Sequence, residues 1–375
     1  MIVREVFRPW RAIAKPAMKR CLITAWRRAL RSLLLCHAML LLVCAGQAGA
    51  AERFEFSRIK MGAPFKLVLY ADDQAAADRA AEAAYGRVDE LNMIFSDYQP
   101  DSELSRLSRA SPTREPVKLS DPLWAILVRA RALSEASDGA FDVTVGPYVR
   151  LWRRARKLPA LPDVAALAQA GKAVGYQNLV LDPATHTATL LREHMLLDLG
   201  GIAMGYTVDE VLGVLARQGI RQALVDGSGD IGVGDPPPGK PGWTIGIAPP
   251  TAGEPPTRYV TLANTAITTS GDMFQHVDIG GVRYSHIVNP KTGLGLTDQT
   301  SVTLIARDCL TADSVTKAIA VNGPEKGLKM VAEIPGAEVL IRRMVGAQME
   351  TYESPGFKAF AAEPEPAASE PAASR

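Results

Sequence analysis

Cysteine is scarce in this chain of 375 residues, and its placement is uneven. Three of the four cysteines, Cys21, Cys36 and Cys44, lie within the first fifty residues, so Cys309 is alone in the remainder. A single cysteine cannot form an internal disulfide, and it cannot build a cysteine-based metal cluster. We therefore expect Cys309 to be a small, partly buried side chain without a chemical role.

The N-terminal region lacks a hydrophobic run long enough to cross a bilayer. Its apolar run covers residues 33–45 and is broken once by a histidine, whereas a membrane-spanning helix needs roughly 20 apolar residues. The first fifty residues hold nine Lys or Arg against one acidic residue, and a small-residue sequence, Ala-Gly-Ala, ends at Ala50. These features are typical of a secretory signal peptide. We predict that residues 1–50 are removed by cleavage near Ala50; an uncleaved anchor and lipid attachment at Cys44 are the alternatives.

An excess of positive charge is also missing. Without residues 1–50 the chain keeps 33 Lys or Arg and 39 Asp or Glu, a formal balance of −6. A mildly acidic protein has no electrostatic footprint for nucleic acid, so no nucleic-acid partner is expected.

Helical and strand patterns alternate along the chain, and there is no fixed-period repeat. Asp72 or Asp73 is predicted to cap a helix that extends to about Phe95, and Asp121 with Pro122 is predicted to begin another. Other helices are expected at 162–174, 206–218, 311–321 and 324–333. Strands are expected at 66–70, 178–182, 188–191, 195–199, 222–226, 243–248, 258–262, 283–288, 301–306 and 338–342.

This mixture predicts an α+β fold with mixed sheets and packed helices, with a soft boundary near residues 157–177. Near the C-terminus, Glu-Pro and Ala-Ala-Ser repeat without large apolar residues. We predict that the folded domain spans residues 51–355 and that residues 356–375 form a disordered tail.

A glycine-rich turn follows one predicted strand, over residues 198–206 (DLGGIAMGY). Its glycines allow a ligand to approach the backbone, and the helix behind it offers free N–H groups and a partial positive charge. The glycine spacing differs from the dinucleotide-binding fingerprint. From this motif alone, a phosphate site and a ligand-free tight turn are equally good interpretations.

Four further stretches carry polar groups of the kinds that bind ligands or take part in catalysis. Asp230 ends a small-residue loop, which by itself is more often a hairpin; residues 268–272 (TTSGD) gather hydroxyls and one carboxylate; and His286 lies among polar loop residues. Asp313 and Thr316 lie one helical turn apart, a spacing that suits Mg²⁺ as well as an ordinary N-terminal cap. Tyr98 and Phe141 follow helices, where an aromatic ring could stack on a flat heteroaromatic group or simply pack.

Taken in order, the motifs of this chain resemble those of the ApbE family, the FAD:protein FMN transferases. The resemblance covers roughly residues 54–345. It rests on Met61-Gly62 and on SDYQPDSELSRLS, GAFDVTVGP, LDLGGIAMGY, VDGSGDIGVG, TSGD, YSHIVNPKTG and TADSVTKA.

The resemblance implies a two-lobed single unit that binds FAD and Mg²⁺. It implies cleavage of the diphosphate, transfer of FMN to a Thr of an acceptor flavoprotein or flavin-binding redox domain, and release of AMP. It also implies action in the periplasm, with association with the periplasmic face of the inner membrane. The implied flavin-binding and cofactor-binding residues are Met61, Tyr98, Ala140, Phe141, Asp142, Asp198, Met204, Asp230 and His286.

The implied catalytic residues are His286 and Asp313, and the implied metal ligands are the Gly201 carbonyl and Asp313. Two positions depart from the family pattern. Met204 stands where Lys is usual, and Lys317 stands where a metal-binding Thr is usual, four residues after Asp313. Thr316 is then a substitute ligand, or the Lys317 ammonium replaces part of the metal's charge, because a protonated Lys cannot bind a metal.

Three activities are compatible with these departures. The first is FMN transfer to protein. The second is hydrolysis of FAD by water, which makes the protein an FAD pyrophosphatase of the same fold. The third is a catalytically weak flavin-binding or maturation accessory protein.

Overall fold

The computed structural model describes residues 51–364 except 159, 250–253, 272–274 and 347. The predicted signal peptide and the end of the predicted tail lie outside the described residues. From Glu52 onward the chain forms one compact unit, so the region 157–177 does not separate two domains. Among the described residues, no helix is long and apolar enough to span a membrane.

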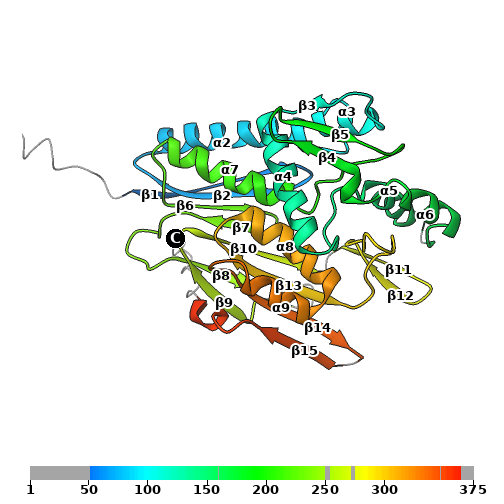
Figure 1. Cartoon of the computed structure of the whole chain (residues 1–375). Coiled ribbons are helices and arrows are strands. Elements are labelled where there is room, and N and C mark those ends of the chain that lie inside the picture. Colours follow the sequence, from blue (N-terminus) through cyan, green and yellow to red (C-terminus); the bar gives the residue numbers. More distant parts are fainter. Residues whose placement is uncertain (1–50, 159, 250–253, 272–274, 347, 365–375) are drawn as a thin grey trace, which may run out of the picture. The chain divides into compact units, whose positions relative to one another are not determined.

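An eight-stranded sheet forms the centre of this unit (Figure 1). The strands lie in the order β1-β2-β6-β7-β10-β13-β14-β15, and every neighbouring pair is antiparallel. Their bounds are β1 Glu52–Lys60, β2 Ala63–Ala71, β6 Ala223–Gly227, β7 Asp230–Val233, β10 Thr265–Gly271, β13 Thr300–Ala306, β14 Glu338–Val345 and β15 Gln348–Glu353.

Alternating side chains give this sheet two apolar faces. On β2, Phe65, Leu67 and Leu69 point into one hydrophobic cluster, whereas Val68 joins the cluster on the other face. Helices cover the first face, with α8 and α9 lying over β13 and β14 in Figure 1. These helices are α2 Gln74–Phe95, α7 Ala203–Arg217, α8 Cys309–Asn322 and α9 Pro324–Ala332.

A small three-stranded sheet covers the second face, in the order β16-β9-β8. Its strands are β8 Trp243–Ile247, β9 Arg258–Leu262 and β16 Ala361–Ala362, and the 3-10 helix η2, Phe357–Phe360, precedes β16. The prediction that residues 356–375 are a disordered tail is wrong for this described part. Phe357 is only 1% exposed and fills the cluster beneath the sheet, and β16 pairs with β9.

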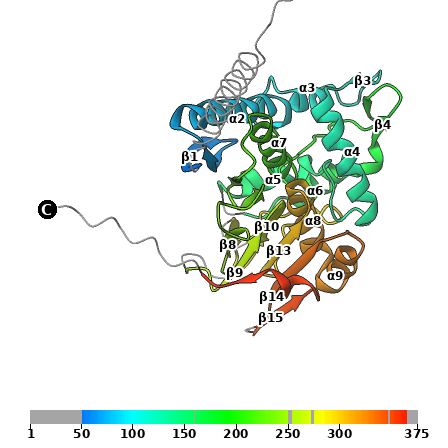
Figure 2. The same ribbon diagram turned by 90° about the vertical axis from the view of Figure 1, so that its left-hand side faces the viewer.

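A second lobe is built on the far end of α2 and has its own hydrophobic cluster. It contains α3 Glu103–Arg109, α4 Asp121–Ala136, α5 Gly146–Ala155, α6 Val164–Gly171, the 3-10 helix η1 Tyr176–Asn178, and a sheet of β3 Val117–Lys118, β5 Thr187–Leu190 and β4 Leu179–Asp182. The hairpin of β11 His276–Ile279 and β12 Val282–Ser285 packs near α5, as Figure 1 shows. Figure 2 shows the same unit turned by 90° about the vertical axis, again with α2, α4 and α7 labelled.

The α+β class and the two-lobed single unit are confirmed, with antiparallel sheets. Two local predictions need correction. Ser120 caps α4 in place of Asp121, because its hydroxyl accepts from the Leu123 N–H. Residues 195–199 form no strand; Leu196 makes only a single parallel bridge, to Val145. Helix α5 was not predicted at all.

Candidate active site

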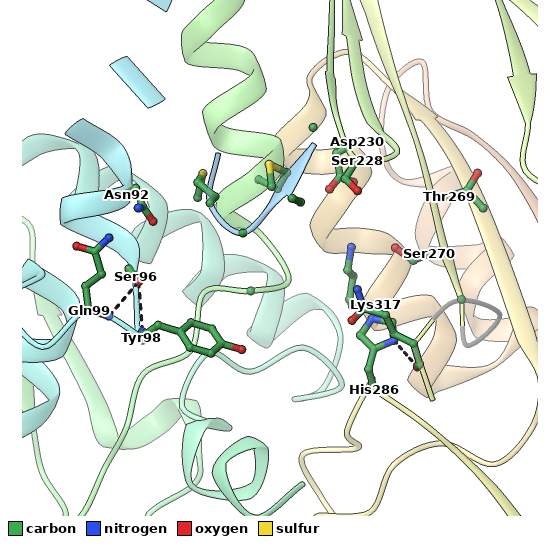
Figure 3. A pocket seen from close by; sticks show the side chains of 18 of the residues that line it. Asn92, Ser96, Tyr98, Gln99, Ser228, Asp230, Thr269, Ser270, His286 and Lys317 are labelled. Carbon is green, nitrogen blue, oxygen red and sulfur yellow. Dashed lines mark hydrogen bonds between the residues drawn. The ribbon is translucent and has the colours of Figure 1, made fainter. Parts of the chain in front are cut away.

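Two adjoining cavities open between the lobes of the unit, of about 990 and 210 Å³. They share five lining residues, Tyr98, Gly200, Gln275, His286 and Lys317. In Figure 3, Tyr98 points into the space from the loop after α2, and His286 and Lys317 lie on the opposite side. The two cavities are therefore two halves of one cleft that meet at these side chains.

The glycine-rich turn brings the beginning of α7 to the cleft. Asp198 accepts a hydrogen bond from the Gly200 N–H at 2.8 Å, which shapes the turn. Gly205 allows α7 to lie against α8, because a Cβ at this position would be 2.3 Å from the Cys309 carbonyl oxygen. The Gly205 N–H donates to Oδ2 of Asp313 at 3.0 Å, so the backbone of α7 fixes that carboxylate.

Asp313 and Lys317 form an ion pair inside the cleft, which we call the deep pair. They lie four residues apart on α8, so both side chains share one helix face. Burial lowers the pKa of Lys317, but Asp313 and Asp230 outweigh it, and the pKa ends above its ordinary value. Burial and the neighbouring Asp313 raise the pKa of Asp230 to about 7, although Lys317 works against the rise.

Thr316, the predicted substitute metal ligand, lines neither cavity. Its side chain is fully buried, and its hydroxyl lies within hydrogen-bonding distance of both Ser270 Oγ, at 2.8 Å, and the Asp313 carbonyl oxygen, at 2.7 Å. Met204 does line the cleft, and it packs over Gly227, where a Cβ would be 2.7 Å from the Met204 sulfur. The thioether thus supports the loop that carries Asp230 and offers no charge.

His286 stands where the two cavities meet. Its Nδ1 lies 3.1 Å from the Gln275 carbonyl oxygen, which also accepts from the His286 backbone N–H at 3.0 Å. Burial lowers the pKa of His286 to about 4, and the nearby Lys317 ammonium contributes to the decrease. The imidazole is therefore neutral at pH 7, and donation from Nδ1 to the carbonyl leaves the Nε2 lone pair free.

At the mouth of the smaller cavity, Arg153 joins three segments in what we call the rim cluster. Its guanidinium forms ion pairs with Asp97 at 2.5 Å and Asp198 at 3.2 Å. It also lies 4.0 Å from the ring centre of Tyr98, a cation-π contact that positions this largely exposed ring. Burial, followed by the charge of Asp97, raises the pKa of Asp198.

The remaining predicted flavin-side residues are divided between the two cavities. Ala140, Phe141 and Asp142 line the smaller one, and Met61 lines the larger one from the tight β1–β2 turn, where its φ is +51°. The Asp142 carboxylate is occupied by its own loop: it accepts from the Thr144 N–H and hydroxyl and from the Tyr176 N–H at 2.7–2.8 Å. Asp142 thus organises the wall of the cavity.

Several residues of the cleft were not predicted from the sequence. Arg153 comes from α5, Arg156 directly follows its last residue, and Gln275 comes from the segment before β11. The run RRAR in residues 153–156 was the available signal for the two arginines. Asp272, from the TTSGD motif, lies outside the described residues.

The residues present do not fit the expected Mg²⁺ site. Each oxygen of Asp313 already has a contact, one with the Lys317 ammonium and the other with the Gly205 N–H. The side chain of Lys317 passes over Gly201, since its Cγ lies 3.4 Å from where a Gly201 Cβ would be. Within the described ranges, no group of three or more His, Cys, Asp or Glu could hold a metal ion.

Comparison with known proteins places this cleft in context. The ApbE family profile matches residues 61–341. An FAD:protein FMN transferase of Vibrio cholerae is 32% identical over 328 residues, 85% of this chain and 96% of the relative. One from Treponema pallidum is 31% identical over 313 residues, 79% of this chain and 86% of the relative.

Two solved structures are similar across the same region. The flavin transferase ApbE of Vibrio cholerae has a TM-score of 0.72 and 30% identity, covering 83% of this chain and 99% of that chain. The ApbE protein of Thermotoga maritima has a TM-score of 0.74 and 30% identity, covering 83% of this chain and all of that chain. With its motifs in order, its fold matched and three quarters of its length covered by the profile, this chain belongs to the ApbE family.

Proposed function

We propose that the protein is an FAD:protein FMN transferase that attaches FMN through a phosphoester bond to a Thr of an acceptor flavoprotein. The observation that carries this proposal is the junction of the two cavities. A neutral imidazole, His286, and an ammonium, Lys317, line it together with the glycine-rich turn. A nucleotide with two halves joined by a diphosphate suits a cleft of two cavities with its charged and basic groups at the junction.

The reaction needs one bond to form and one to break. The Thr hydroxyl oxygen attacks the phosphorus of the FMN half, and the bond from that phosphorus to the bridging oxygen breaks. AMP leaves with the bridging oxygen. Such transfers depend mainly on positioning and on charge stabilisation, which fixed donors in the cleft provide.

His286 takes the proton in this mechanism. With Nδ1 facing the Gln275 carbonyl, the Nε2 lone pair accepts the proton of the Thr hydroxyl as the new bond forms. Without a ligand, the low pKa of His286 keeps its imidazole unprotonated. The negative charge of a bound diphosphate raises the pKa of His286 and so makes it a stronger base.

The resemblance implies magnesium dependence, but in this protein Lys317 pairs with the Asp313 carboxylate that would hold Mg²⁺. The donors for the diphosphate are the Lys317 ammonium and the backbone at the beginning of α7.

The test is to incubate the purified protein with FAD and an acceptor domain, with the same domain carrying Ala at its acceptor Thr as the control. We expect an FMN mass adduct on the Thr domain alone, with one AMP released for each adduct. AMP release without an adduct would instead identify an FAD pyrophosphatase. Tight FAD binding without AMP would identify an accessory protein. Either result overturns the proposal.

We also propose that the protein works in the periplasm, in contact with acceptors at the periplasmic face of the inner membrane. The composition of residues 1–50 supports export. Expression of the full chain, cell fractionation and N-terminal sequencing check this. We expect periplasmic protein that begins near Ala51, and cytoplasmic protein with an intact N-terminus would contradict it.

A further inference from the structure

Lys317 is the most unusual side chain of the cleft. Its aliphatic part packs over Gly201, its ammonium pairs with Asp313, and it lines both cavities. Among the described residues that line the larger cavity, it is the only lysine or arginine. Its side chain is 17% exposed, so a ligand can reach the charge while most of the chain stays buried.

The position of Lys317 excludes a metal from the place where one was expected. It lies across Gly201 and Asp313, the two groups implied as ligands, and it uses one carboxylate oxygen while the Gly205 N–H uses the other. The third candidate, the Thr316 hydroxyl, is fully buried and is held by Ser270 Oγ and the Asp313 carbonyl oxygen. A divalent cation would have to break the deep pair and would then face an ammonium group at close range.

The same position lets the ammonium do electrostatic work. A lysine ammonium has three N–H donors, and one of them serves Asp313. The other two are available to phosphate oxygens in the cleft. Asp313 is fixed by the backbone of α7, so the ammonium is held in place before any substrate binds. Preorganised donors of this kind stabilise developing charge without further rearrangement.

We propose that the Lys317 ammonium takes the place of the divalent cation at the FAD diphosphate, so that FMN transfer by this protein needs no metal. The inference rests on the proposed transferase function. Lys317 stays protonated throughout. It donates hydrogen bonds to the diphosphate oxygens as negative charge moves onto the departing AMP, while the Thr proton goes to His286.

The first experiment uses the unaltered protein. FMN transfer to the acceptor domain is measured in EDTA, in Mg²⁺ and in Mn²⁺, together with FAD affinity by flavin fluorescence. We expect rates and affinities that agree within about twofold in all three, because the charge is built in. Transfer that disappears in EDTA and returns with Mg²⁺ overturns the inference and leaves the transferase function intact. Absence of an adduct in every condition instead overturns the function.

The second experiment exchanges the charge for a metal ligand. Lys317→Thr places a hydroxyl one turn after Asp313. We expect the transfer rate of this variant to be about a hundredfold lower in EDTA. Adding Mg²⁺ or Mn²⁺ should restore most of that rate. Electron paramagnetic resonance should detect Mn²⁺ bound to this variant and none bound to the unaltered protein. Mn²⁺ bound by the unaltered protein, or no gain of metal response in the variant, contradicts the inference.

Controls separate the charge from folding. Lys317→Met should lose about a hundredfold without rescue by metal, and Lys60→Met is its matched control. Lys60 also pairs with an aspartate, Asp89, at the same 17% side-chain exposure, but it lines neither cavity. Because Lys317→Met leaves the buried Asp313 carboxylate without its countercharge, the double variant with Asp313→Asn removes both charges. It should fold, bind FAD more weakly and show no response to metal.

Discussion

The deep pair and the rim cluster each hold one cation at the edge of the same cleft, but they are built differently. Lys317 and Asp313 belong to a single helix, and the helical repeat alone places them together. Arg153 gathers Asp97, Asp198 and Tyr98 from three separate segments. The deep cation is therefore fixed by local structure, while the rim cation depends on how the second lobe packs against the glycine-rich turn.

This difference predicts that the rim cluster tolerates substitutions better than the deep pair does. A charge within one helix, shielded from water, should be sensitive to any change that moves that helix. A partly exposed cation with several partners should lose them one at a time at modest cost, because ion pairs that water can reach contribute little individually. The effects of substitutions should therefore be largest where the two regions meet and smallest at the rim.

The largest effect is expected at His286, where the regions meet. His286→Asn keeps similar size and polarity but cannot take the Thr proton, so the transfer rate should fall by about 10²–10⁴. FAD affinity should change only a few-fold. His194→Asn is the matched control, because His194 is exposed and its φ of +62° suits asparagine. A rate within tenfold of the unaltered protein would remove His286 from the role of base.

A second effect concerns the N-terminus of α8, which sets the position of the deep pair. Asp209 accepts from the Cys309 and Leu310 N–H groups, and burial raises its pKa to about 7. Because the folded state holds a proton that the unfolded state has lost, this group's stabilising contribution is fully present below about pH 4 and is lost as the pH rises toward 7.

Denaturant unfolding of the FAD-free protein at several pH values checks this expectation. At about 1.4 kcal/mol per pKa unit, Asp209 contributes up to about 4 kcal/mol to the fall in unfolding free energy between about pH 4 and pH 7. Asp209→Asn cannot titrate and should make the profile flatter by part of that amount. If the unfolding free energy of Asp209→Asn changes with pH as steeply as that of the unaltered protein, the pH dependence arises from the other buried carboxylates.

The close packing of α7 on α8 is the third target. Gly205→Ala puts a Cβ against the Cys309 carbonyl and the Asp313 Cβ, so the helices must separate. We expect a loss of about 2 kcal/mol in unfolding free energy, with transfer reduced as the deep pair shifts. Gly213→Ala on the same helix meets only the flexible end of Arg217, at 3.3 Å, and should be neutral or slightly stabilising. Equal effects for the two variants would show that helix propensity, rather than packing, decides the outcome.

The smallest effect is expected at the rim. Arg153→Met removes the cation-π contact and both ion pairs, and we expect FAD affinity to fall about tenfold while the maximal rate changes little. Adding Tyr98→Ala should cost less than the sum of the single changes, since the two side chains act together. Arg154→Met, on the exposed neighbour, is the control. Full additivity of the two substitutions would mean that Arg153 does not position Tyr98.

The same contrast explains which parts could be predicted from the sequence. The Asp313–Lys317 spacing, the cap of α2 at Asp73 and the glycine turn before α7 are local patterns, and the structure contains all three. Successive helix residues differ by about 100° around the axis, so Thr316 faces another way than Lys317. Its hydroxyl is buried against Ser270, whereas Lys317 lines both cavities.

Other features depend on contacts between distant parts of the chain. Helix α5 was missed because Val145 gives it no side-chain cap, so Arg153 could not be placed beside Tyr98. Residues 195–199 have a strand-like composition, but only Leu196 finds a backbone partner. Strand β16 has two residues, and its pairing with β9 spans about a hundred residues of sequence, which no local pattern reveals.

The junction of the two cavities affects how the product leaves the cleft. An acceptor enters with a bare hydroxyl and leaves with a tricyclic ring, a sugar-alcohol chain and a phosphate attached to the same side chain. The path out must therefore be wider than the path in. Tyr98, which is 74% exposed and lines both cavities, therefore lies beside that path.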